Sequence, residues 1–294
     1  MAQAGGSTGN MSNREYYLTE VFAENPYGGN RLATITNAEG LSTQEMQAIA
    51  LAFNFAETTF ICGGNAAEGF DVRIFTPAVE IPFAGHPTLG TAFLLREVLN
   101  RSHARILDLN LTVGKIPVTF GADGILWMRQ NQPEFGRQLE TDVVSAELGI
   151  DPGLLDHNFP CQFVSTGLEF LLVPVSSSLA LKEISIGINN LAPSILLFCR
   201  GGYETGQAVS ARMFAAEFGV SEDPATGSAN GCLAAYLVEH QYFGGEKVEI
   251  RVGQGYEIQR PSQLYLDAAK TEAGNFEINV GGKVNLVASG EWLL

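Results

Sequence analysis

The stretch from Arg212 to Glu239 constrains the fold most, because it runs from a β-like segment through a Gly-rich turn into an apolar helix. After the turn at Glu222–Ser228, the helical run is apolar on every side, which is typical of a helix that is buried all round. Its first turn leaves backbone N–H groups without intrahelical partners and carries about half a positive charge. The corner at Gly227 and Ser228 is therefore predicted to bind an anion such as a substrate carboxylate.

The same construction occurs earlier in the chain, between Val72 and Leu99. There, Gly85 and His86 occupy the place that Gly227 and Ser228 hold in the later copy. The two copies agree in pattern more than in identity. A repeat of this length predicts two pseudo-equivalent halves, each with one enclosed helix whose N-terminal end carries a polar side chain on a Gly turn.

Short alternating segments separated by Gly or Pro make up most of the remaining chain. One of the few helices opens with the capping box Ser42–Glu45, and a hairpin is expected around Gly114. Many strands with few crossover helices favour an α+β fold. We expect two pseudo-symmetric domains, each a mostly antiparallel sheet curled around a central buried helix.

The polar break at Asn131–Gly136 is predicted to be the crossover between the halves. We therefore expect an N-terminal half-barrel domain of residues 14–130 plus 284–294, and a C-terminal half-barrel domain of residues 131–283. A chain of 294 residues is long enough for two cores. The Gly/Ser/Asn-rich residues 1–13 are predicted to be a disordered lead.

The net charge of −15 argues against nucleic acid as a partner, because phosphate binding needs clustered Lys and Arg. No apolar run is long enough to cross a bilayer, and the first residues lack the order of a secretory signal, so we expect no membrane partner. The four cysteines lie in or beside apolar runs without CxxC spacing, which indicates buried thiols in a reducing compartment. These observations predict a cytoplasmic protein.

Glu57 is a carboxylate set between apolar residues, in the run Phe55–Phe60. A solvated surface glutamate is the commoner meaning of such a residue. Apolar neighbours, however, raise the pKa of a carboxyl group by disfavouring its charged form. A group that takes and returns a proton near neutral pH needs a pKa of this kind, so Glu57 is a candidate acid/base.

Three further polar residues have two possible interpretations each. A lone histidine is usually structural, but the helix dipole disfavours protonation of His86, whose neutral ring can donate to a substrate oxygen. Asp223 either belongs to a solvated turn or faces a cleft, and Asn30 either tolerates an unusual backbone angle or contacts a ligand. The chain contains no paired His ligands, no GxxxxGK[ST] and no Rossmann glycine pattern, so we expect neither a metal nor a nucleotide cofactor.

Four separated motifs, in the right order, resemble those of the PhzF family of phenazine biosynthesis, which has a diaminopimelate-epimerase-like fold. They are NPYGGNRLA, AETTF, RIFTPAVEIPFAGHPTLGTA and GVSEDPATGSANG. The resemblance implies that Glu57 is the acid/base, and it implies a homodimer. The positions that it carries over to the active site are Gly85, His86, Asp223, Gly227 and Ser228.

The wider fold resembled here includes two-base epimerases with one Cys thiolate in each half. This chain has Ala84 and Pro224 at those turn positions, which excludes stereoinversion by a Cys pair. The resemblance instead implies a cofactor-free biosynthetic isomerase, similar to trans-2,3-dihydro-3-hydroxyanthranilate isomerase, acting on a small unsaturated or cyclic carboxylic acid. The alternative is a catalytically silent binding protein that keeps the scaffold.

Overall fold

The computed structural model describes residues 14–187, 189–216 and 220–293. The predicted disordered lead at residues 1–13 lies outside these ranges. The elements of the first half are β1 (Arg14–Val21), β2 (Asn30–Ile35), α1 (Thr43–Phe53), β3 (Glu57–Asn65), β4 (Gly69–Phe75), β5 (Glu80–Ile81), α2 (Gly85–Phe93), the π-helix η1 (Leu94–Val98), β6 (Ile106–Leu111), β7 (Gly114–Phe120) and β8 (Leu126–Arg129).

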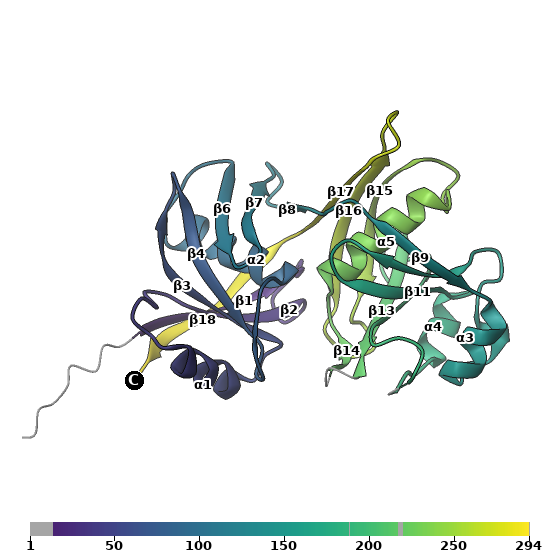
Figure 1. Cartoon of the computed structure of the whole chain (residues 1–294), viewed down its shortest axis with the longest axis horizontal. Coiled ribbons are helices and arrows are strands. Elements are labelled where there is room, and N and C mark those ends of the chain that lie inside the picture. Colours follow the sequence, from purple (N-terminus) through teal and green to yellow (C-terminus); the bar gives the residue numbers. More distant parts are fainter. Residues whose placement is uncertain (1–13, 188, 217–219, 294) are drawn as a thin grey trace, which may run out of the picture.

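The elements that follow form the second half, except for the last strand. They are β9 (Glu134–Leu139), α3 (Thr141–Leu148), the 3-10 helix η2 (Pro152–Leu154), β10 (Cys161–Ser165), β11 (Glu169–Pro174), α4 (Ser178–Glu183), β12 (Ile195–Arg200), β13 (Val209–Ala215), β14 (Val220–Asp223), α5 (Gly227–Glu239), β15 (Lys247–Gln254), β16 (Ser262–Lys270), β17 (Phe276–Gly282) and β18 (Val284–Trp292). Strand β18 returns to the first half and pairs with β1 (Figure 1).

The strand pairing of the first half is repeated in the second. In the first half β1 pairs antiparallel with β2, β2 parallel with β3, β3 antiparallel with β4, and β4 parallel with β6. The strands β10, β11, β12, β13 and β15 pair in the same sequence of directions. In each half the last of these parallel steps crosses over through a helix, α2 or α5. The repeat confirms the predicted α+β fold with pseudo-symmetric halves.

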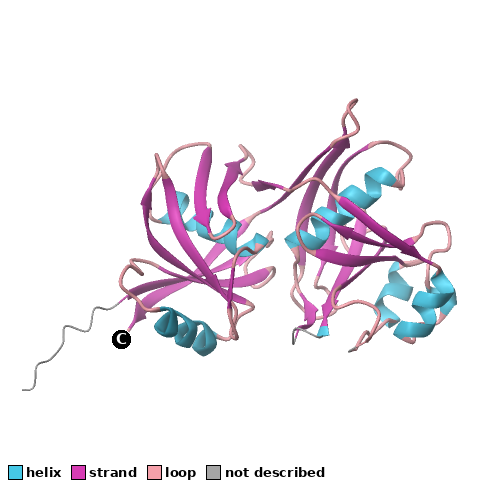
Figure 2. Cartoon of the chain, in the orientation of Figure 1, coloured by secondary structure: helices cyan, strands magenta, loops and turns pink. Residues whose placement is uncertain are grey.

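Both crossover helices are enclosed by strands of their own half (Figure 2). Every residue of α2 from Gly85 to Ala92 is buried, and so is every residue of α5 from Ala229 to Val238. A helix that is apolar all round has no face for solvent, so the sheets must curl around it. The main core of the protein consists of these two helices and the inner faces of the surrounding strands.

The two halves lie side by side and are joined through strands (Figure 1). Strand β8 pairs with β7 of the first half and with β17 of the second, so the sheet passes continuously between them. The chain crosses twice, once between β8 and β9 and once between β17 and β18. The predicted domain limits of residues 14–130 plus 284–294 and 131–283 stay a prediction.

The predicted crossover at Asn131–Gly136 is too long, because β9 already begins at Glu134. Pro133 and Gly136 suggested a turn, but Pro133 directly precedes the strand and Gly136 lies inside it. A Cβ atom built on Gly136 would lie 3.0 Å from the Cβ of Phe163 on β10. Gly136 therefore permits a close approach of two strands, which is a second common use of glycine within a sheet.

Other local predictions are confirmed. The Ser42 side chain accepts from the Glu45 backbone, and the Glu45 side chain accepts from the Ser42 backbone, so the capping box forms. Strands β6 and β7 form the hairpin that ends at Gly114. All four cysteines are free thiols, but Cys62 is partly exposed rather than buried.

Gly90 allows α2 to pack closely against β1 and β2. A Cβ atom there would lie 2.6 Å from Cδ2 of Leu32 and 2.9 Å from Cγ2 of Val21, both fully buried. We expect Gly90→Ala to lower the free energy of unfolding by about 1 to 2 kcal/mol, because overpacking outweighs the gain in helix propensity. Urea unfolding measures the change.

The matched control is Gly231→Ala in α5, where the three atoms nearest to a Cβ atom would all belong to the side chain of Gln130. That side chain is partly exposed and can turn aside. We expect this variant to be as stable as the wild type or slightly more stable. Equal stability of both variants would contradict the close packing of α2.

Candidate active site

The N-terminal ends of α2 and α5 meet at the boundary between the halves. A Cβ atom built on Gly85 would lie 3.7 Å from the Cα of Gly227 and 3.8 Å from the backbone nitrogen of Ser228. The preceding residues, Ala84 and Thr226, make no side-chain hydrogen bond that caps either helix. Without such caps, the first N–H groups of both helices can bind a ligand, and their partial positive charges add at one point.

Glu57 and His86 lie in contact beside these helix ends. Glu57 is the first residue of β3, and His86 is the second residue of α2. The Oε2 atom of Glu57 lies 3.3 Å from Nε2 of His86, with side-chain exposures of 18% and 7%. Among the described residues, neither of these two buried atoms has a hydrogen-bond partner of acceptable geometry. Two unsatisfied polar atoms of this kind mark a place where a ligand can bind.

Burial determines the protonation of this pair. Burial, and to a smaller extent the charge of Asp223, raises the pKa of Glu57 to about 8. Burial lowers the pKa of His86 to about 3, although a hydrogen bond with the Arg31 backbone acts in the opposite direction. At neutral pH His86 is therefore neutral and Glu57 is mostly protonated, so their contact is not an ion pair. We predicted a neutral His86 from the helix dipole, but desolvation is the largest cause.

Asp223 ends β14 and receives hydrogen bonds from both halves. Nδ2 of Asn30 donates to Oδ1 of Asp223 at 2.9 Å, and the Thr226 hydroxyl donates to Oδ2. Burial raises the pKa of Asp223 to about 6, and these two hydrogen bonds oppose the rise. The solvated-turn interpretation of Asp223 is wrong, because its carboxyl group is enclosed and paired with protein donors.

Asn30 has neither an unusual backbone angle nor a free amide nitrogen. It is absent from the described residues with positive φ. Besides Asp223, its Nδ2 atom donates to the carbonyl oxygen of Ala225 at 3.1 Å. Both N–H bonds of the amide are thus used across the boundary between the halves, which leaves only the amide oxygen for a substrate.

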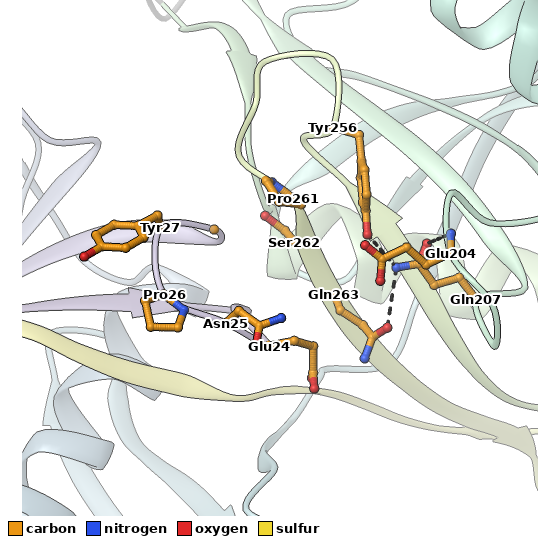
Figure 3. Close-up of a pocket in the computed structure, with 11 residues that line it drawn as sticks. Glu24, Asn25, Pro26, Tyr27, Glu204, Gln207, Tyr256, Pro261, Ser262 and Gln263 are labelled. Atoms are coloured by element: carbon orange, nitrogen blue, oxygen red, sulfur yellow. Dashed lines mark hydrogen bonds between the residues drawn. The ribbon is translucent and has the colours of Figure 1, made fainter.

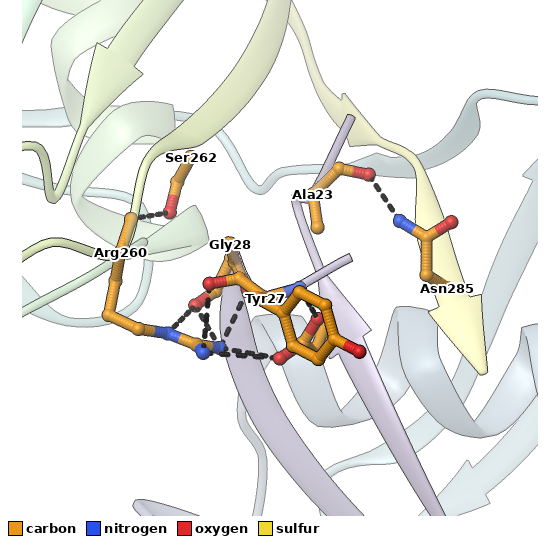
Figure 4. Close-up of polar contacts among 8 residues, drawn as sticks. Ala23, Tyr27, Gly28, Arg260, Ser262 and Asn285 are labelled. Carbon is orange, nitrogen blue, oxygen red and sulfur yellow. Dashed lines mark hydrogen bonds and ion pairs between the residues drawn. The ribbon is translucent and has the colours of Figure 1, made fainter. Parts of the chain in front are cut away.

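Arg260 holds the turn that precedes Asn30 (Figure 4). Its guanidinium donates to the carbonyl groups of Tyr27 and Gly28, at 3.1 and 2.6 Å. The same group pairs with the buried carboxylate of Glu20 on β1 at 3.1 Å. Arg260 belongs to the turn between β15 and β16, so a residue of the second half fixes a loop of the first. Sequence analysis missed Arg260, because nothing in its local sequence marks it.

A separate cavity lies between this turn and the second half (Figure 3). Its volume is about 230 Å³, and its lining residues are Glu24–Gly28, Glu204, Gln207, Tyr256 and Pro261–Gln263. The Gln207 amide donates to Tyr256 and Gln263, so polar groups of the lining bond to one another. None of the site residues predicted from the sequence lines this cavity, which is thus distinct from the candidate active site.

The remaining predicted residues lie where the repeat placed them. Gly85 and Gly227 are the first residues of their helices, and Ser228 is partly exposed at the second position of α5.

Within the described part of the chain, no group of three or more His, Cys, Asp or Glu side chains could hold a metal ion. In the same residues, no helix combines the length and apolar character that a membrane crossing requires.

Comparison of the whole chain with known proteins shows which family it belongs to. The profile of the PhzC-PhzF family, described as phenazine biosynthesis-like protein, matches residues 19–290. The chain belongs to this family. Trans-2,3-dihydro-3-hydroxyanthranilate isomerase from Pseudomonas aeruginosa is 33% identical, over 94% of this chain and 98% of that protein. The chain is thus a PhzF-type isomerase.

Solved structures agree with the family in fold. A PhzF-family phenazine biosynthesis protein from Bacillus anthracis has a TM-score of 0.87 and 27% identity, covering 97% of this chain and all of that one (100%). A hydroxyproline epimerase from Agrobacterium vitis has a TM-score of 0.57 at 10% identity, covering 96% of this chain and 93% of that one. The second likeness shows that the PhzF family shares its fold with epimerases.

We expect Glu57→Gln to change the pH dependence of stability. The folded protein keeps Glu57 protonated up to about pH 8, whereas the unfolded chain ionises near the ordinary value of 4.5. Between these values the folded state binds the extra proton, so wild-type stability falls as pH rises. The variant lacks this loss and should gain about 1 to 3 kcal/mol over the wild type between pH 5 and pH 8.

Urea unfolding at both pH values measures this difference in the free energy of unfolding. The control is Glu134→Gln, which alters an exposed glutamate on β9. Its difference from the wild type should be the same at both pH values. A pH-independent difference for Glu57→Gln as well would show that Glu57 ionises in the folded state as it does in the unfolded chain.

Proposed function

We propose that the protein is a cofactor-independent isomerase that moves a proton within a small unsaturated or cyclic carboxylic acid, with Glu57 as acid and base. One observation carries the proposal. The buried Glu57 carboxyl lies 3.3 Å from a neutral His86, beside two helix ends whose N–H groups lack side-chain caps. An acid/base with a pKa near neutrality next to a site for negative charge suits the transfer of a proton between carbons.

The substrate class follows from the helix ends. Free N–H groups at Gly85 and Gly227 suit a carboxylate, and the net charge of −15 means that local dipoles, not the overall field, must attract it. The Pseudomonas aeruginosa relative is named for trans-2,3-dihydro-3-hydroxyanthranilate, which is our first candidate substrate. We expect the enzyme to act as a cytoplasmic homodimer, without nucleic-acid or membrane partners.

The reaction needs only one proton carrier. The carboxylate form of Glu57 removes a proton from a carbon conjugated with the substrate carboxyl group, and the electron pair moves into the conjugated system. The N–H groups of α2 and α5 stabilise the negative charge that develops on the substrate oxygens. Glu57, now a carboxylic acid, returns the proton to another carbon on the same face. A double bond moves, and the substrate keeps its number of protons. While Glu57 holds the proton as an acid, part of it exchanges with solvent, so that in heavy water deuterium enters the product.

The neutral state of His86 matters for this cycle. A protonated imidazole beside Glu57 would act as a counter-ion and lower the pKa of the carboxyl group. Because burial lowers the pKa of His86 to about 3, the ring packs against Glu57 without such an effect. Glu57 can therefore hold its proton tightly enough to return it to carbon.

We expect Glu57→Gln to lower turnover by at least about a thousandfold, because the amide cannot carry the proton. The assay uses trans-2,3-dihydro-3-hydroxyanthranilate and a panel of cyclic dienoic acids in heavy water, with deuterium uptake into the product followed by NMR. Glu134→Gln is the control and should match the wild type. Undiminished deuterium uptake by Glu57→Gln would reject Glu57 as the proton carrier.

We expect kcat/KM to rise with pH and to level off above about pH 8, where Glu57 is ionised. Below this pKa the carboxylate fraction falls about tenfold per pH unit, since the reaction starts from the base form. Measurements between pH 6.5 and 9 avoid the titration of Asp223 at about 6. A flat profile across this range would contradict a base with a raised pKa.

A further inference from the structure

The amide groups around Asp223 have only one possible orientation. Nδ2 of Asn30 faces the carbonyl oxygen of Ala225 at 3.1 Å, and Nε2 of Gln254 faces the carbonyl oxygen of Asp223 at 2.9 Å. A carbonyl oxygen can only accept a hydrogen bond, so each of these contacts requires the nitrogen of the amide. The backbone thus determines where the donors of both side chains point.

Gln254 is buried and uses both ends of its amide. It ends β15, has no exposed surface, and its Oε1 accepts from Nδ2 of Asn230 at 2.9 Å. The Asn230 amide is oriented in the same way, because Nδ2 also donates to the carbonyl oxygen of Thr226 at 3.0 Å. Rotation of the Gln254 amide by half a turn would place donors against donors and acceptors against acceptors. Its orientation is therefore locked.

The locked amide determines the direction of the Thr226 hydroxyl group. Nε2 of Gln254 donates to Oγ1 of Thr226 at 3.1 Å, so this oxygen accepts from that side. The hydroxyl has a single hydrogen, which remains available for Oδ2 of Asp223. Asn30 donates to the other carboxyl oxygen at 2.9 Å. Asp223 thus accepts on both oxygens, and hydrogen bonds of this kind favour the charged form.

We propose that Gln254 is a positioning residue that directs the Thr226 hydroxyl towards Asp223 and so keeps Asp223 an ionised hydrogen-bond acceptor. Its effect on turnover rests on the proposed function, whereas its effect on Asp223 does not. Within the described part of the chain, Oε2 of Glu57 has no such donor, so one acid of the site keeps its proton and the other loses it. An ionised Asp223 in turn raises the pKa of Glu57.

The charges around Asp223 come from several elements. Glu222 on its own strand raises the pKa of Asp223, but Arg212 on β13 pairs with Glu222 at 2.8 Å. Glu57 on β3 interacts with Asp223 electrostatically. The groups that reach Asp223 from β2, β15 and the turn before α5 are uncharged amides and a hydroxyl. The hydrogen bonds from Thr226 and Asn30 are therefore the main interactions that lower the pKa of Asp223 against the effect of burial.

The test is a carbon-13 NMR titration of the Asp223 carboxyl group in the full-length protein, with the resonance assigned by Asp223→Asn. Thr226→Val keeps the shape of the side chain but removes the hydroxyl, and Gln254→Met removes the amide. We expect both to raise the titration midpoint of Asp223 by about one pH unit, because each removes or frees a donor. Thr226→Ser keeps the hydroxyl and should restore the wild-type midpoint.

The matched control is Gln162→Met, which removes another buried amide, bonded to Gly136 and His240 on the far side of the second half. It should leave the Asp223 midpoint unchanged, although it can lower stability. Thermal unfolding of every variant tests whether a shift follows from loss of structure, and Gln254→Leu replaces Gln254→Met if that variant does not fold. An unchanged midpoint in Thr226→Val, or in a folded variant of Gln254, would overturn the proposal.

A second readout separates this inference from the proposed function. With a turned-over substrate, the pH profile of kcat/KM should show a lower inflection at about 6 from Asp223, below the Glu57 inflection at about 8. Thr226→Val should move this lower inflection upwards together with the NMR midpoint, while Thr226→Ser restores it. If the wild type turns over none of the panel, the proposed substrate class fails, whereas the titration still decides the role of Gln254. A shifted midpoint with an unmoved lower inflection would restrict Gln254 to setting the charge of Asp223.

Discussion

The structure depends on the close approach of two buried helix ends. α2 and α5 begin at Gly85 and Gly227, and a Cβ atom on Gly85 would lie within 3.7 Å of the opposite backbone. Two positive helix ends repel each other unless an anion or a carboxyl group lies nearby. The curled sheets hold the helices in place because both are apolar on every side, and the Asn30–Asp223 contact joins the halves around the same point. The close approach of the N-terminal ends of α2 and α5 thus determines both the packing of the two halves and the position of the site.

Two carboxyl groups in one site have opposite surroundings. No residue that the structure describes offers a hydrogen bond of acceptable geometry to Oε2 of Glu57, and the pKa of this group rises to about 8. Asp223 is enclosed as well, but it receives hydrogen bonds on both oxygens and its pKa rises only to about 6. Environments that separate two pKa values in this way assign different roles to chemically similar groups. Near pH 7 one acid carries a proton, and the other carries a charge.

Periodicity and local chemistry predicted the fold and the centre of the site. The repeat located both buried helices and their Gly corners, and the apolar surroundings of Glu57 indicated its raised pKa. Two residues that hold other parts of the site in place could not be predicted. Gln254, which acts within the second half, and Arg260, which acts across the halves, lie in segments without a motif, and their contacts arise only when folding brings distant residues together. The predicted crossover was extended too far, to Gly136, for a related reason: the residue that Gly136 packs against, Phe163, is distant in sequence.

The return of β18 to the first half has a consequence for the order of events in synthesis. β1 leaves the ribosome before its partner β18, which is translated after all the other described strands. Until then β1 has β2 on one edge only, and its other edge is open to pairing with foreign strands. The nascent chain therefore completes its first sheet only after the whole second half has been made. A ribosome that stalls before β18 would release a protein with an exposed, aggregation-prone edge.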